Sequence, residues 1–154
     1  MILDESLEFA DAVSVAAAAG TALIGDVVDL SLVGSDLGNG EDMWVVIRTT
    51  TEIITAGAAG TIQFFLASDA QAAITTGFTQ HLASSVLVSD DAAANSSELN
   101  AGGTILMAKL PTGTYERYLG IMCTIATTTV TAGAIDAFLT RNVAKWRSYP
   151  NNIQ

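Results

Sequence analysis

Short stretches in which apolar and polar residues alternate recur from one end of the chain to the other. A period of two is typical of β-strands with one buried face, whereas amphipathic helices repeat about every 3.6 residues. The strongest stretch is Met43–Thr51, MWVVIRTTT, which is rich in β-branched and aromatic residues. The pattern predicts seven or eight strands, and the clearest cover residues 27–32, 43–51, 60–68, 78–89, 104–109, 116–127 and 135–140.

The alternation also indicates which side chains face the core. In Glu116–Thr127 the odd-numbered positions from 119 to 125 are the more apolar set, so they are expected to form the inner face. The inward residues expected in three of the strands are Ile62, Phe64 and Leu66, then Leu82, Val86 and Val88, and then Leu119, Ile121, Cys123 and Ile125.

The segments between the strands suggest how they connect. Residues 53–59 are too rich in glycine for a strand interior, and they predict a hairpin loop that makes 43–51 and 60–68 antiparallel neighbours. The polar stretch 89–103 predicts a long loop. The alanine-rich segments 16–19 and 69–74 favour helix, but neither is long enough to form a layer.

Many short strands with glycine-containing turns, and no alternation of strands with long helices, indicate an all-β protein. We expect a single-domain antiparallel jelly-roll sandwich of about eight strands over residues 1–141. Residues 142–154 are expected to form a C-terminal tail that serves as an anchoring extension.

Composition and charge exclude several classes of function. Sixteen acidic residues against six basic ones give a net charge of −10, and charged residues make up only 14 % of the chain. Proteins that bind duplex nucleic acid need clustered lysine and arginine, so we expect no direct nucleic-acid partner. No apolar run is long enough to span a membrane, and Met1–Ser6 lacks the basic start of a signal peptide, so we expect a cytoplasmic site of synthesis and no membrane partner.

The residues needed for catalysis or metal binding are scarce. The single cysteine, Cys123, lies among apolar neighbours and is most simply a buried hydrophobic residue, and the single histidine, His81, cannot form a His/Cys metal cluster. Asp36, Asn39 and the acids that follow do not have EF-hand spacing. We therefore expect no enzymatic activity, no metal and no cofactor.

The charges are unevenly distributed along the chain. Nine acidic residues and no basic one lie between Met1 and Asp42, whereas half of the basic residues lie between Arg141 and Arg147. Either group is a candidate interface, because arginine and aromatic residues are enriched at interface hot spots and acids can meet a basic partner. The alternatives are a solvated acidic face and a terminus that merely covers the sheet. The candidate interface residues are Asp4, Glu5, Glu8, Asp11, Arg141, Lys145, Trp146, Arg147 and Tyr149.

Several short motifs occur in a fixed order over nearly the whole chain. They are Met1-Ile2-Leu3-Asp4 with Leu7 and Phe9–Ala12, Asp29-Leu30 at a strand end, Gly38–Glu41 before Trp-Val-Val-Ile, Arg117-Tyr118-Leu119 after Pro111, and Val130–Gly133 before the last strand. In order and spacing the chain resembles the Bbp16-like cement proteins of tailed-bacteriophage capsids, from Met1 to about Arg141.

This resemblance implies a jelly roll that decorates the outer surface of an HK97-like capsid. The implied partner is the major capsid protein, bound at junctions between subunits, and the implied location is the virion after synthesis in the bacterial host cytoplasm. The protein is expected to bind copies of itself, with a homodimer favoured over a trimer. A carbohydrate-binding jelly roll is the alternative, with Trp146, Tyr149 and Tyr115 as candidate aromatic platforms.

Overall fold

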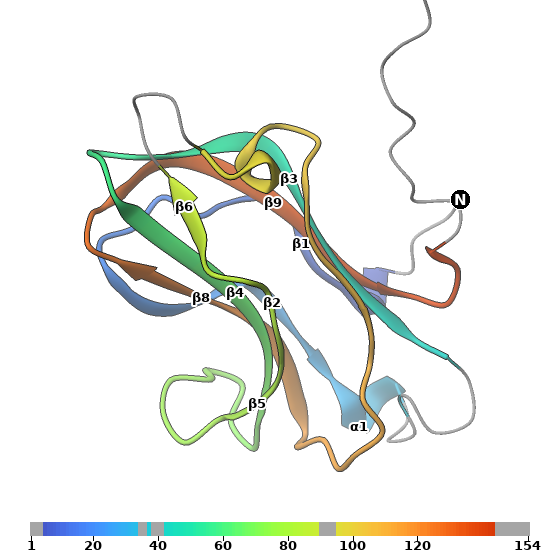
Figure 1. Ribbon diagram of the computed structural model, residues 1–154. Helices are drawn as coiled ribbons and strands as arrows, with labels where there is room; N and C mark the ends of the chain where they lie inside the picture. The colour runs from blue at the N-terminus through green and yellow to red at the C-terminus, as the bar shows by residue number, and fades with distance from the viewer. Residues whose placement is uncertain (1–4, 34–36, 38–41, 90–94, 144–154) are drawn as a thin grey trace, which may run out of the picture.

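The computed structural model describes residues 5–33, 37, 42–89 and 95–143, and within these residues the chain forms nine strands in two antiparallel sheets (Figure 1). Sheet A has the strand order β1-β9-β3-β7, and sheet B has the order β2-β8-β4-β5, with β6 also pairing with β4. The strands are β1 (Glu8–Ser14), β2 (Gly20–Asp29), β3 (Trp44–Thr55), β4 (Gly60–Asp69), β5 (Thr79–Ala83), β6 (Leu87–Ser89), β7 (Thr104–Lys109), β8 (Tyr118–Ala126) and β9 (Val130–Thr140). Three short helical turns accompany them: η1 (Glu5–Leu7), α1 (Leu30–Val33) and η2 (Ser97–Leu99).

The expected all-β sandwich is confirmed. Most consecutive strands alternate between the two sheets, an order that is compatible with the expected jelly roll. The core lies between the sheets, and the inner face predicted for β8 is buried there, since Leu119, Ile121, Cys123 and Ile125 are all at most 4 % exposed.

One open side of the sandwich is closed by the edge strands β1 and β2, which contact each other without pairing. Gly25 in β2 has φ +70° and lies against the backbone of Phe9 in β1, where an added Cβ would come within 2.0 Å of the Phe9 carbonyl oxygen. Only glycine combines this left-handed backbone with so close an approach. The two sheet edges meet at this point.

The predicted hairpin between residues 43–51 and 60–68 is wrong. Strand β3 continues to Thr55, and the chain then crosses from sheet A to sheet B, so β3 and β4 lie in different sheets. Buried hydrogen bonds fix this corner, because the Thr55 hydroxyl donates to the Ser89 carbonyl oxygen at 3.0 Å and the Thr55 N–H donates to the Ser89 hydroxyl at 3.2 Å. Gly133 in β9, with φ +135°, lies close to Ile53 of the neighbouring strand β3, where an added Cβ would come within 2.6 Å of the Ile53 side chain.

The strand predicted over residues 78–89 is two strands, and its inward residues were assigned incorrectly in part. Ser84 interrupts the ladder, because its hydroxyl accepts a hydrogen bond from the Phe64 N–H at 3.1 Å. After this break the phase of the alternation is inverted. Val86 and Val88 are 58 % and 41 % exposed, whereas Leu87 is buried.

Other differences follow from contacts that the local pattern does not encode. The strand expected over 27–32 begins at Gly20 and ends at Asp29, β9 begins at Val130, and β1 was not predicted. Residues 16–19 and 70–74 are not helical. Instead, Ile74 packs on the outer side of sheet B in a second apolar cluster with Phe65, Ala67 and Met122.

Candidate interaction surface

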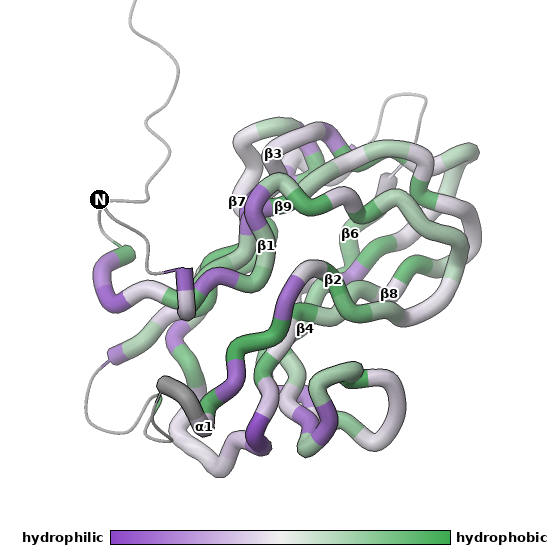
Figure 2. The backbone as a smooth tube through the Cα atoms, turned by 180° about the vertical axis from the view of Figure 1, so that it is seen from behind, coloured by the Kyte–Doolittle hydropathy of each residue, from purple (hydrophilic) through white to green (hydrophobic). Residues whose placement is uncertain are grey.

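An acidic groove runs along the side where the two sheet edges meet. Two adjoining hollows, of about 280 and 470 Å³, share Glu5, Glu8 and Asp26 in their walls. Figure 2 shows hydrophilic segments on β1 and β2 beside this junction. We use the name acidic groove for the surface lined by Glu5 of η1, Glu8 and Asp11 of β1, and Asp26 and Asp29 of β2.

The local structure of β1 places its acids on the outside. The ladder between β1 and β9 has two register shifts, one between Glu8 and Ala10 and one between Ala10 and Val13. Ala12 has φ +49° and donates its N–H to Asp136 at 2.9 Å. These irregularities bury Phe9 and Ala10 while Asp11 remains exposed. An irregular edge strand of this kind also disfavours pairing with a foreign strand.

The groove concentrates negative charge. The pKa of Glu8 is raised, first because the carboxylate is partly removed from water, and then because Asp11, Asp136 and Glu5 repel its charged form. A basic group that entered the groove would relieve this repulsion.

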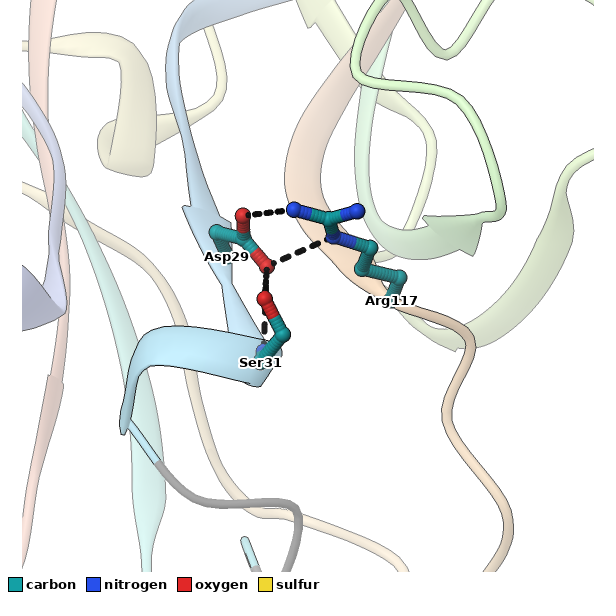
Figure 3. Close-up of polar contacts among 3 residues, drawn as sticks. All are labelled: Asp29, Ser31 and Arg117. Carbon is teal, nitrogen blue, oxygen red and sulfur yellow. Dashed lines mark hydrogen bonds and ion pairs between the residues drawn. The ribbon is translucent and has the colours of Figure 1, made fainter.

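Asp29 is the one acid of the groove that the described structure neutralises (Figure 3). The Arg117 Nε and Nη2 donate to its two carboxylate oxygens at 3.1 and 2.9 Å, and the Ser31 hydroxyl donates to Oδ1 at 2.7 Å. These hydrogen bonds, those from Arg117 before those from Ser31, hold the pKa of Asp29 far below its ordinary value. The Arg117 guanidinium also lies over the ring of Tyr118, 4.9 Å from its centroid.

A second polar cluster, not expected from the sequence, surrounds His81. Ser68 Oγ lies 2.8 Å from His81 Nε2 and 3.4 Å from Glu116 Oε2, and it accepts a hydrogen bond from the Glu116 N–H at 3.2 Å. In a catalytic triad the acid binds the histidine nitrogen that faces away from the serine, but here it contacts the serine, and Ser68 is 0 % exposed. The cluster therefore joins β4, β5 and the segment before β8, without the geometry of a hydrolase.

The remaining chemical candidates are occupied or buried. Burial raises the pKa of the Cys123 thiol to about 12, which makes it unreactive at neutral pH. Of Asp36, Asn39 and the acids that follow them, the structure describes only Asp42. Its carboxylate forms an ion pair with Lys109 at 2.5 Å. Within the described residues, no group of three or more His, Cys, Asp and Glu side chains could hold a metal ion.

The predicted interface residues are only partly covered by the structure. Glu5, Glu8 and Asp11 come together in the acidic groove, whereas Arg141, which directly follows β9, is not among the residues that line it. Asp4, Lys145, Trp146, Arg147 and Tyr149 lie outside the described residues. Asp26 and the Asp29–Arg117 pair were missed, because they are distant in sequence from the other members of the site.

Of the three aromatic candidates for the carbohydrate alternative, the structure describes only Tyr115. Tyr115 is half-buried, and its ring contacts that of His81 in a tilted arrangement with the centroids 4.5 Å apart. The Tyr115 hydroxyl donates a hydrogen bond to the Pro111 carbonyl oxygen. Trp146 and Tyr149 lie outside the described residues.

Comparison with known protein families identifies the family to which this chain belongs. The model of the Bbp16 family matches residues 9–139, which include every strand but the ends of β1 and β9. The chain belongs to the Bbp16 family. Membership indicates a bacteriophage-associated protein, and the match confirms the family resemblance over residues 9–139.

The Bbp16 match takes in most of the acidic groove. Glu8 and the short turn η1 precede the matched residues, whereas Asp11, Asp26, Asp29 and Arg117 lie within them. No curated protein matches this Bbp16-family chain. No described helix in it has the length and apolar character of a membrane span.

Proposed function

We propose that this protein is a capsid cement protein. It binds the outer surface of an HK97-like bacteriophage shell at junctions between major capsid proteins, and it stabilises the assembled shell. The observation that carries the proposal is the acidic groove on a sandwich of the Bbp16 family. Its role is adhesive rather than catalytic, and its partners are the major capsid protein and copies of itself.

The physical basis is linkage between binding and assembly. A protein that binds the assembled shell and not the free subunits shifts the equilibrium toward the shell by mass action. Because the shell repeats the same junction many times, contacts of modest strength suffice at each site.

The acidic groove supplies the charge for such a contact. Glu5, Glu8, Asp11 and Asp26 form one negative surface, and a basic junction on the shell would complement it. The contact would depend on salt, because exposed charges are screened over about 8 Å at physiological ionic strength.

The double variant Glu5→Gln/Glu8→Gln tests this contact in binding to preformed shells. We expect affinity to fall about tenfold at low salt, since two interfacial charges contribute up to about 1 kcal/mol each, and to fall much less at high salt. Co-sedimentation of the full chain with shells measures the affinity at low and at high salt, at about 50 and about 500 mM.

The matched control is Glu52→Gln/Glu98→Gln, which makes the same chemical change outside the groove, and it should bind as the natural protein does. Equal affinity of both double variants at low salt would contradict the assignment of the groove to the shell contact.

A further inference from the structure

The outer face of sheet B has a region without charge, although the chain as a whole is strongly acidic. Residues 20–25 of β2, residues 60–68 of β4 and the whole of β6 and β8 contain no charged side chain. Register aligns the outward side chains of these strands in two neighbouring rows, because directly opposite residues share a face. We use the name neutral face for these two rows, which are Ala126, Thr61 and Val88, and then Thr21, Thr124 and Gln63.

The neutral face is open to solvent and partly apolar. Thr21 and Ala126 are exposed, and the hydroxyls of Thr21 and Thr124 lie 2.8 Å apart on the surface. Within the described residues, Val86 and Val88 are the exposed large hydrophobic residues, and Val88 belongs to the neutral face. Exposed apolar side chains on a surface depleted of charge are typical of the centre of an interface.

The neutral face adjoins the acidic groove along the edge strand β2. Val27 lines one hollow of the groove and also packs against the apolar cluster on the outer side of sheet B. The side chains of Leu23, Val27 and Ile74 gather over Gly120, where an added Cβ would come within 2.7 Å of Leu23. Leu23 lies two positions after Thr21 in the same strand, so both face outward. One continuous surface therefore leads from the groove to the neutral face.

We propose that the neutral face binds a second subunit of the shell, beside the subunit that the acidic groove contacts, through an uncharged and partly apolar surface of that subunit. The inference rests on the proposed function, because a protein that holds a junction together must contact both of its sides. Continuity with the groove places the two contacts next to each other. The lack of charge selects the chemistry of the second contact, since a charged group of the partner would lose its hydration there without gaining an ion pair.

The two contacts should respond differently to salt. The groove contact is electrostatic and is screened, whereas a contact that depends on burial of apolar surface is not weakened by screening. The natural protein is therefore expected to retain shell binding at about 500 mM salt, where the groove contributes little.

A charge of either sign at Val88 tests the neutral contact. The full-length variants Val88→Glu and Val88→Lys are compared with the natural protein by co-sedimentation with preformed shells at about 500 mM salt. Each variant should bind at least about tenfold more weakly, because each buries a charge that has no partner. A contact with a charged surface would instead be weakened by one sign and strengthened by the other.

The matched controls are Thr51→Glu and Thr51→Lys, at an exposed β-branched position of β3 in sheet A, and both should bind as the natural protein does. Far-ultraviolet circular dichroism checks that each variant folds. Ala126→Glu and Ala126→Lys, at an exposed position in the same row as Val88, provide the test if the Val88 variants do not fold.

Unchanged shell affinity of the Val88 variants, or opposite effects of glutamate and lysine, would overturn the inference and leave the groove contact intact. Sedimentation velocity without shells gives a further check. A natural oligomer that Val88→Lys converts to monomers would also overturn the inference, because another copy of the chain would then occupy the face. Failure of the natural protein to bind shells at either salt concentration would overturn the proposed function as well, so the two failures are distinguishable.

Discussion

Ser68, His81 and Glu116 form a polar cluster that joins β4, β5 and the segment before β8. Burial lowers the pKa of His81, and the nearby charge of Glu116 acts in the opposite direction. The lowered pKa means that the folded protein favours neutral His81, which shares a hydrogen bond with the buried Ser68 hydroxyl. Protonation would place a second charge in this half-buried cluster.

This cluster predicts a loss of stability in mild acid. A histidine whose folded pKa lies below its unfolded value of about 6.5 contributes stability above that pH and loses it as the pH falls through the folded pKa. The free energy of unfolding, measured by urea denaturation at pH 7.5 and 5.5, should therefore decrease more for the natural protein than for His81→Gln.

The comparison with the variant isolates His81 from the other titrating groups. Glu8, whose pKa is raised, acts in the opposite direction at lower pH and is present in both proteins. Identical pH dependence of the two proteins would show that His81 does not carry the effect.

At the scale of elements, the junction of β1 and β2 positions the acidic groove. Gly25 has φ +70° and lies against the backbone of Phe9, so a methyl group added to Gly25 would push the edge strands β1 and β2 apart. Gly25→Ala should lower the free energy of unfolding by about 2–4 kcal/mol, the combined cost of a left-handed alanine and an overpacked contact. Chemical denaturation measures this loss.

Gly57→Ala is the matched control, because an added Cβ there has no heavy atom within 4 Å. It should change the free energy of unfolding by less than about 0.5 kcal/mol. A similar loss of free energy of unfolding in both variants would show that the close approach of β1 to Gly25 is not the reason for a glycine at this position.

The elements also show how far the sequence predicts the fold. Strand β7 was predicted with its observed bounds, and the inner face of β8 was correct, because both depend on local alternation. The position of β4 in a different sheet from β3 depends on long-range hydrogen bonds such as that between Thr55 and Ser89. The phase inversion in 78–89 depends on one side chain, Ser84, that replaces a backbone partner.

The candidate site was predictable to a similar extent. Glu5, Glu8 and Asp11 are close in sequence, so their clustering could be inferred from the acidic N-terminal third. Asp26 joins them only because β1 and β2 meet, and the separation of 88 positions between Asp29 and Arg117 leaves no local signal for their ion pair.

At the scale of the whole molecule, the net charge of −10 is unevenly distributed, with nine acidic residues and no basic one between Met1 and Asp42. The acidic groove lies on one side of the sandwich, where β1 and β2 meet. Low charge over the rest of the chain suits a protein that packs against neighbours.

The central claim is attachment to the capsid, and cryo-electron microscopy of phage particles assembled in the presence of this chain tests it most directly. The account predicts ordered density for the sandwich outside the shell, at junctions between major capsid proteins, with the acidic groove against the shell. Particles that lack the chain, or that carry it anywhere other than the outer surface of the shell, would contradict the account.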